Sequence, residues 1–354
     1  MKRIGIYTII ANNFGAQLQA YATARYLISI CKDCVVELVK IADEPEHKNL
    51  RTIIKSFLPS QILQKKAYKN FESLYPLTQS FTKEELINRP LQYDIYIIGS
   101  DQVWNVSNGV ASHLMYFLPF QTKSPKIALA SSFGTSVISQ QAKKEISNYL
   151  SDFSSISVRE TDGISILKSM GIDAHLILDP TFWIETNEWS RLAGNEPIIK
   201  GEYIVTYGFE ISNSHIQFLI DTIKEVYKMK VIAINGARIF RHDKNYNSCG
   251  PIEFLNIVKF SKMVFTGSYH GTIFSILFRK NFFVVPHSTK NSRMENLLSL
   301  LNIKERMLPT DSSIYKSIIM NASIIDYAKL EDSISNDQIK TRDYIRKTIK
   351  KYLI

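Results

Sequence analysis

Short apolar runs rich in β-branched residues alternate with segments of helical periodicity over most of the chain, and this alternation constrains the fold more than any other feature. The strand-like runs lie at residues 3–10, 35–41, 93–101, 126–134, 154–160, 202–209, 231–236, 262–268 and 282–286. Runs this short and this apolar, separated by amphipathic helices, are typical of parallel sheets covered by helices on both faces. The sequence therefore predicts an α/β fold with parallel sheets.

Length and the position of a break in the alternation predict two domains. The chain has 354 residues, whereas one domain usually has about 100–200. The alternation stops near residues 185–200 and then restarts. We expect two Rossmann-like domains facing a cleft, at 1–187 and 188–330. The polar, mostly helical stretch at about 43–90 is expected to be an insertion in the first domain.

The C-terminal residues 331–354 read as a surface helix that packs back on the first domain, with membrane attachment as the alternative. The net charge of the chain is +10, but the basic residues are scattered, and only "KTRDYIRKTIKKYLI" at 340–354 is visibly enriched in them. This pattern favours an anionic small molecule or an acidic membrane surface as partner, and no nucleic-acid-binding motif is present.

The location expected from the sequence is the cytoplasm. No stretch approaches the roughly 18 apolar residues that span a bilayer, and the apolar N-terminal run lacks a signal-peptide cleavage site. The cysteine count is 3, and a chain of this length does not depend on disulfides. The C-x-x-C of Cys31 and Cys34 follows a helical pattern instead of preceding one, so we expect it to have no redox role.

Small, polar and charged residues recur where the predicted strands end, which is where open parallel sheets bind ligands. The most informative of these turns is "TGSYHGT" at 266–272. Its glycines allow close approach of the backbone, Ser268 or Thr272 can cap the next helix, and the first N–H groups of that helix can bind phosphate or carboxylate. His270 is expected in the first helical turn, where it can donate to an anion or move a proton. The alternative is a histidine that only caps or packs.

Three charged residues follow or precede other predicted elements. Arg159 ends a strand and suits bidentate contact with a carboxylate or phosphate, or else forms a surface pair with Glu160. Arg293 precedes a helix and can add positive charge. Asp101 can act as a general base toward a hydroxyl group, or else forms an Asx-type turn or a helix cap for "DQVWN".

Several common site motifs are missing from the sequence. It contains neither G-x-x-x-x-G-K-[ST] nor G-x-G-x-x-G, which speaks against a P-loop and against ordinary dinucleotide binding. Asp101 and Asp179 leave a metal site open, but no ligand spacing demands one. We expect neither a metal nor an organic cofactor.

The chain resembles the polysaccharide pyruvyl transferases through "NNFGAQLQAYA", "YDIYIIGSDQVWN", "SVRE", "LDPTFWI" and "TGSYHGTIFSILFRKNFFVVP", in this order. The resemblance implies a fold like that of GT-B glycosyltransferases. It also implies transfer of pyruvate from phosphoenolpyruvate to two hydroxyls of a sugar, as a cyclic ketal, in a bacterial surface polysaccharide or its lipid-linked precursor. A lipid-linked acceptor would bring the basic tail to the inner membrane face.

The resemblance also implies roles for individual residues. The family's essential histidine falls on His270 and its donor-binding arginine on Arg159, with Arg293 competing for that role. The C-terminal domain is then the phosphoenolpyruvate side, and the N-terminal domain is the acceptor side. Further donor contacts are expected from Ser268, Tyr269, Gly271 and Thr272, and acceptor contacts from Asn13, Gly15, Gln19, Ser100 and Asn105.

Two other functions remain open. One is a nucleotide-sugar glycosyltransferase on the same two-domain fold, although "TIFSILFRKNFFVV" lacks an acidic residue that would bind a ribose. The other is a non-catalytic binding protein on a degenerate transferase fold, which the presence of His270, Arg159 and Asp101 disfavours.

Overall fold

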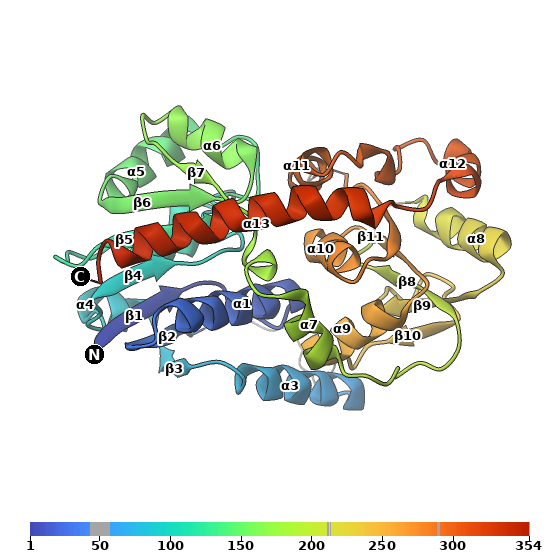
Figure 1. The fold of residues 1–354 in the computed structure, drawn as a ribbon, viewed down its shortest axis with the longest axis horizontal. Coiled ribbons are helices and arrows are strands. Elements are labelled where there is room, and N and C mark those ends of the chain that lie inside the picture. Colours follow the sequence, from blue (N-terminus) through green and yellow to red (C-terminus); the bar gives the residue numbers. More distant parts are fainter. Residues whose placement is uncertain (43–56, 211, 213, 289–290, 354) are drawn as a thin grey trace. The chain divides into compact units, whose positions relative to one another are not determined.

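The computed structural model describes residues 1–42, 57–210, 212, 214–288 and 291–353, which form two compact units (Figure 1). Within these residues, the first unit comprises 1–42, 72–184 and 335–353. The second unit comprises 57–71 and 185–334. The units divide between Ile184 and Glu185, close to the point where the alternation of strands and helices pauses in the sequence.

The first unit is built on a seven-stranded sheet whose strand pairs are all parallel. Its strand order is β3-β2-β1-β4-β5-β6-β7. The strands are β1 (Lys2–Tyr7), β2 (Cys34–Ile41), β3 (Leu77–Phe81), β4 (Ile95–Ile98), β5 (Lys126–Ser131), β6 (Phe153–Val158) and β7 (His175–Leu176). The central strands β4 and β5 are buried along their whole length, which explains their unbroken apolar sequences.

Helices cover both faces of this sheet. They are α1 (Phe14–Ile30), α4 (Lys83–Asn88), α5 (Gln140–Leu150), α6 (Thr161–Lys168) and the 3-10 helices η1 (Val110–Phe117) and η2 (Pro180–Phe182). On the face that carries Tyr96 and Ile98, the core centres on Trp104, which is fully buried and stacks on Phe117. On the other face α1 lies against β2 and η2, with Tyr26 packed edge-on against Trp183.

The C-terminal helix α13 (Tyr327–Lys350) belongs to the first unit from Ser335 onward. Several side-chain hydrogen bonds hold it there. The amide of Gln338 donates to the carbonyl of Phe182 (2.9 Å), the hydroxyl of Tyr26 donates to the carbonyl of Arg342 (3.3 Å), and the hydroxyls of Ser155 and Tyr344 lie 2.8 Å apart. None of the helices within the described residues combines the length and apolarity needed to cross a membrane.

The second unit is built on a five-stranded parallel sheet of order β10-β9-β8-β11-β12. Its strands are β8 (Tyr203–Tyr207), β9 (Lys230–Ile234), β10 (Lys244–Tyr246), β11 (Met263–Thr266) and β12 (Asn281–Val284). Its helices are α7 (Thr186–Ala193), α8 (Ile216–Tyr227), α9 (Pro251–Phe260), α10 (Tyr269–Leu277), α11 (Ser292–Leu300), α12 (Tyr315–Asn321) and the 3-10 helices η3 (Lys304–Arg306) and η4 (Ser312–Ile314).

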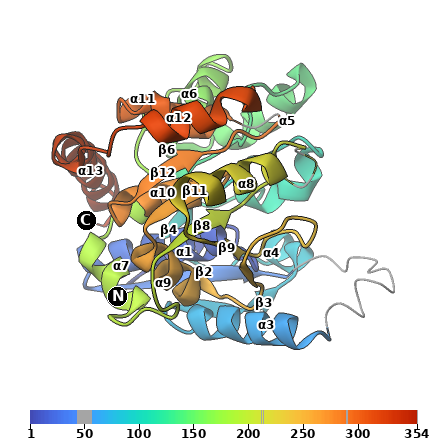
Figure 2. The ribbon, with the colours of Figure 1, turned by 90° about the vertical axis from the view of Figure 1, so that its right-hand side faces the viewer.

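Helices lie on both faces of the second sheet (Figure 2). Ile204 of β8 and Phe265 of β11 share a core with α8 and α12. Tyr203 points to the other face, where its hydroxyl donates to the carbonyl of Ile257 in α9 (2.9 Å). The parallel sheets and the helices on both faces confirm the predicted α/β class.

The structure contains elements that the sequence pattern did not indicate. Strand β3 lies in the stretch 43–90, which was expected to be mostly helical, and pairs with β2 at the edge of the first sheet. Its side chains are half-buried or exposed, so it lacks the apolar run of a central strand. The same stretch contains α4 and α3 (Pro59–Glu72), and residues 59–71 of α3 belong to the second unit. Residues 43–56 lie outside the described residues.

Cys31 and Cys34 are joined by a disulfide, which the sequence analysis did not expect. They lie in the turn between α1 and β2, where the N–H of Cys34 donates to the carbonyl of Cys31 (3.2 Å). This turn brings the two Cα atoms to 5.5 Å, within the range of about 4.4–6.8 Å that a disulfide can bridge.

Replacing Trp104 tests the core of the first unit. Trp104→Ala should lower the free energy of unfolding by about 3–5 kcal/mol, because it leaves a large cavity and removes the donor to the carbonyl of Tyr116. Val137→Ala, at a side chain that is 74% exposed, should change it by less than about 0.5 kcal/mol. Chemical denaturation measures both variants, and equal effects would contradict the assigned core.

Candidate functional site

Both sheets have a topological switch point, where the strand order reverses and ligands of open α/β sheets usually bind. In the first sheet it lies between β1 and β4, and in the second between β8 and β11. The loops that leave these strands at their carboxyl ends carry most of the residues predicted from the sequence. Each unit therefore presents its own candidate site.

In the first unit, Arg159 lies at the centre of a buried charged cluster. Its Nη1 atom donates to Asp179 Oδ2 (2.6 Å) and to Ser100 Oγ (3.1 Å), and its Nη2 atom donates to Asp101 Oδ1 (3.4 Å). Glu160 Oε2 lies 3.7 Å from Arg159 Nε. The side chains of Arg159 and Asp179 are both completely buried.

This cluster changes what can be expected of Arg159. The pair with Glu160 exists but is buried, so the alternative of a surface pair was wrong. The charge of Arg159 is already balanced by carboxylates, and Asp179 is in turn held by the N–H and hydroxyl of Thr181 (3.0 and 2.7 Å). Direct contact of Arg159 with a ligand anion, which stays a prediction, would require this pair to open.

Asp101 combines an unusual backbone conformation with partial exposure. Its φ is 72°, in the left-handed region that non-glycine residues rarely occupy and that is often found at functional sites. Its side chain is 16% exposed, and Oδ1 accepts hydrogen bonds from the N–H of Gln102 (2.9 Å) and from Arg159. The first of these bonds reaches the next residue, whereas an Asx-type turn would reach the residue after it. The exposure leaves the carboxylate accessible to solvent.

The residues predicted for acceptor binding mostly support the loops of the first switch point. The amide of Gln19 is buried and donates to Thr8 Oγ1 (3.0 Å), and Thr8 donates to the carbonyl of Ser100 (2.7 Å). This chain of hydrogen bonds joins the loop after β1 to the loop after β4. Sequence reasoning missed Thr8, whose only signal was its place at the end of β1.

The other predicted acceptor residues lie in the same loops. Asn13 is exposed and caps α1, accepting from the N–H of Ala16 (3.3 Å), and Gly15 is buried in the first turn of that helix. The amide of Asn105 donates to Gln102 Oε1 (2.9 Å). Direct contact of these residues with a sugar stays a prediction.

In the second unit, two glycine-containing loops meet at the switch point. A Cβ at Gly267 would lie 2.6 Å from the carbonyl oxygen of Gly208, and one at Gly271 would lie 2.3 Å from Thr266 Oγ1. Thr266 ties the loops together, because its hydroxyl donates to the carbonyl of Tyr207 (2.9 Å) and accepts from the N–H of Ser268 (3.0 Å). Only glycine fits where these backbones approach one another.

The turn "TGSYHGT" leads directly from β11 into α10, as predicted. Ser268 is the N-cap, and its Oγ accepts from the N–H of Gly271 (3.3 Å), while the hydroxyl of Thr272 donates to the carbonyl of Ser268 (3.1 Å). His270 lies in the first turn of α10 and is 7% exposed. Ser268, and not His270, therefore caps the helix.

Arg293 and His270 both lie close to the ring of Tyr269 in the second unit. The guanidinium carbon of Arg293 is 5.7 Å from the ring centroid of Tyr269, whose ring in turn packs edge-on against His270 at 5.4 Å. Burial raises the pKa of Tyr207 to about 12, against the opposite effect of a side-chain hydrogen bond with Ser268. The structure thus gathers a histidine, an arginine, a phenol and a helix N-terminus in one place.

Sequence reasoning also missed Glu210, which lies beyond β8 outside any motif. Its carboxylate accepts from the N–H and hydroxyl of Ser288 (2.9 and 2.8 Å), and these hydrogen bonds hold the pKa of Glu210 below its usual value. Asp179 had been predicted as a candidate site residue, but not as the partner of Arg159.

Across the described parts of the chain, no group of three or more His, Cys, Asp or Glu residues is placed to hold a metal ion.

The Arg159 cluster can be tested by comparing a buried with an exposed ion pair. Arg159→Ala should lower the free energy of unfolding by about 3–5 kcal/mol, because it leaves Asp179 buried without its partner. Arg241→Ala, which removes the exposed pair with Asp221, should cost less than about 1 kcal/mol. Denaturation curves measure both. An Arg159→Ala variant of undiminished stability would contradict the structural role.

Comparison with solved structures shows the fold. UDP-GlcNAc 2-epimerase from Neisseria meningitidis aligns with a TM-score of 0.57 at 10% identity, covering 99% of this chain and 100% of that one. The putative UDP-N-acetylglucosamine 2-epimerase from Listeria monocytogenes gives 0.58 at 10%, covering 99% and 96%. A UDP-glucosyltransferase from Polygonum tinctorium gives 0.50 at 9%, covering 98% of both chains. The fold is of the GT-B type, with two Rossmann-like sheets.

Comparison with sequence families shows the relationship that the motifs indicated. No curated protein sequence matches the chain at a significant level. The profile of the family "Polysaccharide pyruvyl transferase" matches residues 13–289, which include the motif residues of both switch points. The chain therefore belongs to the polysaccharide pyruvyl transferase family.

Proposed function

We propose that this protein transfers pyruvate from phosphoenolpyruvate to two hydroxyls of a sugar, forming a cyclic ketal in a surface polysaccharide or its lipid-linked precursor. Membership of the family supports this class of reaction. The observation that carries the proposal is the position of His270, buried in the first turn of α10 at the switch point of the second sheet, with Arg293 close by.

The second unit is proposed as the donor side. Phosphoenolpyruvate carries a phosphate and a carboxylate, and the first N–H groups of a helix together with an arginine suit such a ligand. The turn from Ser268 to Thr272 begins α10, and Arg293 adds a positive charge next to Tyr269. The first unit, with Asp101 and the loops after β1 and β4, is proposed as the acceptor side.

The reaction requires a proton at the methylene carbon of phosphoenolpyruvate, which makes C2 electrophilic. A sugar hydroxyl then attacks C2 and loses its proton, the C2–O bond to phosphate breaks, and a second hydroxyl closes the ring and loses its proton. The two protons released balance the one added to the methylene carbon and one taken up by the departing phosphate. His270 either protonates the methylene carbon or stabilises the phosphate, and Asp101 accepts a hydroxyl proton.

Of the two arginines considered for donor binding, Arg293 is the more suitable in this structure. It is half-buried, and it lies in the same unit as His270. Arg159 is buried against Asp179, so we propose that it positions Ser100 and Asp101. Its direct contact with phosphoenolpyruvate stays the alternative.

The rival function is nucleotide-sugar glycosyl transfer. It is favoured by the similarity of the fold to enzymes whose structures contain or are named for UDP-sugars, but an identity of 9–10% carries the fold alone. It is disfavoured because α10 has no acidic residue in its first turn. A non-catalytic binding protein would bind phosphoenolpyruvate without turnover.

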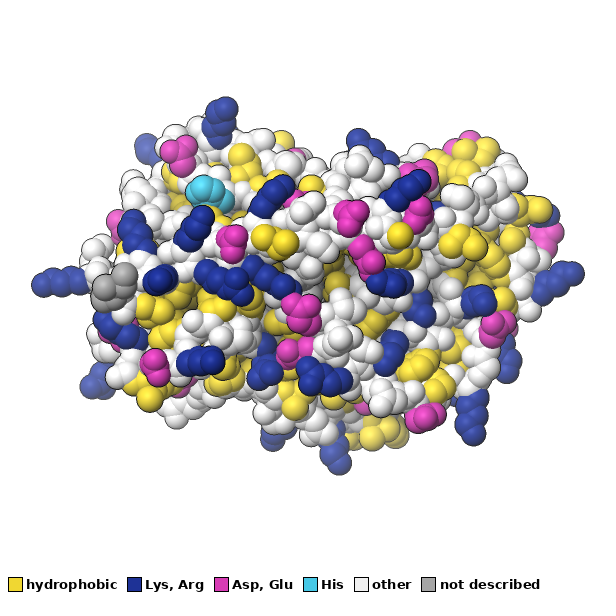
Figure 3. Space-filling model, in the orientation of Figure 1, with side chains coloured by type: hydrophobic (Ala, Val, Ile, Leu, Met, Phe, Trp, Pro, Cys, Tyr) yellow, Lys and Arg dark blue, Asp and Glu magenta, His cyan; other side chains and the backbone are white. Residues whose placement is uncertain are grey.

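The proposed location is the cytoplasm, at the inner membrane face when the acceptor is lipid-linked. Lysine and arginine side chains are scattered over the visible face of the molecule and form a row along α13 (Figure 3). Among the exposed ones are Arg346, Lys347, Lys350 and Lys351. Such a row is suited to anionic headgroups.

The role of His270 is tested by His270→Gln, with His175→Gln, at an exposed histidine, as the matched control. His270→Gln should lower phosphate release from phosphoenolpyruvate in the presence of acceptor by at least about 100-fold, because general acid–base groups contribute about 10²–10⁴-fold. The control should retain full activity. An unchanged rate in a folded His270→Gln variant would overturn the proposed role.

The donor site is tested by binding. Phosphoenolpyruvate should raise the melting temperature of the protein, and Arg293→Ala should weaken its binding by roughly 10- to 100-fold, as expected for a lost charge-assisted contact. Arg279→Ala, just after the other end of α10, is the control and should bind normally. Stabilisation by UDP and not by phosphoenolpyruvate would favour the glycosyltransferase instead.

A further inference from the structure

The second unit contains a pocket of about 390 Å³ at the opposite edge of its sheet from His270. Its lining includes Ile204, Met263 and Asn281, which lie at the starts of β8, β11 and β12. His270 follows the carboxyl end of β11. This volume lies within the range of about 300–1,000 Å³ that is typical of small-molecule sites. We call it the amino-end pocket.

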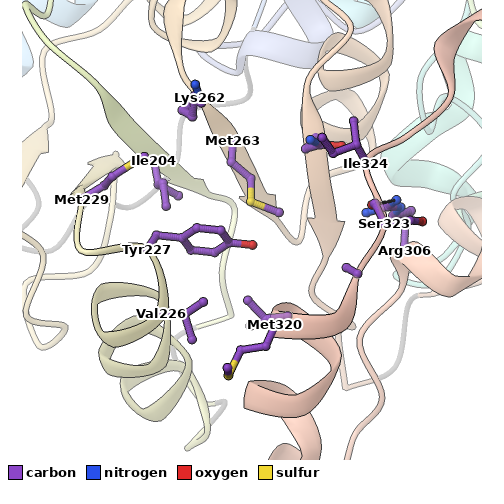
Figure 4. A pocket seen from close by; sticks show the side chains of 13 residues that line it. Ile204, Val226, Tyr227, Met229, Lys262, Met263, Arg306, Met320, Ser323 and Ile324 are labelled. Atoms are coloured by element: carbon purple, nitrogen blue, oxygen red, sulfur yellow. Dashed lines mark hydrogen bonds between the residues drawn. The ribbon is translucent and has the colours of Figure 1, made fainter.

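The walls of the amino-end pocket are mainly aliphatic and thioether side chains. Figure 4 shows Tyr227 and Met320 extending into it, between the strand that carries Ile204 and the segment of Ser323 and Ile324. Met320 is 62% and Ile324 81% exposed, so the mouth is open to solvent. Methionine side chains adapt to ligands of different shape. The apolar lining residues are Ile204, Val226, Tyr227, Met229, Met263, Ile319, Met320, Ala322 and Ile324.

The charged residues that line the pocket, Arg306 and Lys262, are both cationic. Lys262 is largely exposed and pairs with Glu202 at 3.1 Å. Arg306 is only 2% exposed, and its Nη2 atom donates to the carbonyl of Ser323 (2.6 Å). Its Nε atom is buried and makes no hydrogen bond within the described residues.

Within the described residues, the positive charge of Arg306 faces the ring of Phe283, whose centroid is 5.7 Å from the guanidinium carbon, and one carboxylate. This carboxylate is that of Glu305, whose Oε1 atom lies 3.9 Å from Arg306 Nε. The Glu305 side chain is 64% exposed, so solvent screens the attraction between the two charges. Arg306 also lies close enough to Tyr227 to lower the pKa of that phenol, against a larger opposite effect of burial. A buried cation with an unused donor is costly unless an anion binds it.

We propose that the amino-end pocket binds an amphiphilic anion, with its apolar chain against the methionine and isoleucine side chains and its carboxylate or phosphate head on Arg306. The head accepts hydrogen bonds from the guanidinium, and the Tyr227 hydroxyl can donate a further one. The chain leaves through the mouth between Met320 and Ile324. This site is independent of the proposed transferase reaction, because its residues are separate from those assigned to it.

Calorimetry with decanoate, decyl phosphate and the uncharged 1-decanol, all below micelle concentrations, tests the proposal. One of the two anions should bind with a stoichiometry of one and at least about tenfold more tightly than decanol, as expected for a charge-assisted hydrogen bond. Tighter binding of decanoate would identify a fatty-acid source, and tighter binding of decyl phosphate a phosphate-headed lipid. Equal binding of the anions and decanol, or no binding of any of them, would overturn the proposal.

Two kinds of variant locate the binding. Arg306→Met should abolish the preference for the anions while decanol binding is unchanged. Because that buried substitution can impair folding, Ile324→Glu provides a second arm at the exposed mouth, where a negative charge should weaken anion binding at least tenfold. Ile239→Glu is the matched control, since Ile239 is 67% exposed in the same unit but outside the pocket lining. Equal losses in both glutamate variants would overturn the assigned location.

Discussion

The buried guanidinium of Arg159 joins three separate loops at the carboxyl end of the first sheet. It follows β6 directly and bonds to Ser100 and Asp101 after β4 and to Asp179 after β7. A buried cation that satisfies carboxylates in several loops fixes their positions relative to one another, because moving any of them would leave a charge unpaired in a region of low dielectric constant. The left-handed conformation of Asp101 is held within this frame.

The second unit also holds the loops at the carboxyl end of its sheet in fixed positions, but without a buried ion pair among the groups that join them. Its two loops approach so closely that glycine is required, and neutral hydrogen bonds through Thr266 hold them together. No charged side chain takes part in these hydrogen bonds, and Arg293 lies beside them, against the ring of Tyr269. One unit therefore fixes its loops with a buried arginine, and the other fixes them with hydrogen bonds between neutral groups.

The central strands of both sheets could be predicted from the sequence, whereas the edge strands and the contacts between distant residues could not. Strands β4, β5 and β11 are buried on both faces, so their apolar runs were unmistakable. Edge strands β3 and β10 carry exposed or half-buried side chains and left no such pattern. The turn around His270 could be placed because its glycines, cap and histidine are contiguous. The partnership of Arg159 with Asp179, and the amino-end pocket, join residues from distant segments and could not be read from local pattern.

The hydrogen bonds that shape the turn before α10 come from a very small part of the chain. Thr266, Ser268, Gly271 and Thr272 bond among themselves and to the carbonyl of Tyr207. The backbone of the turn that carries the histidine is therefore held mainly by groups at two adjacent strand ends. Such a turn is a self-contained module. The turn could be grafted onto another parallel sheet that has a glycine after the neighbouring strand. The sequences of the surrounding helices could then differ without changing the hydrogen bonds of the turn.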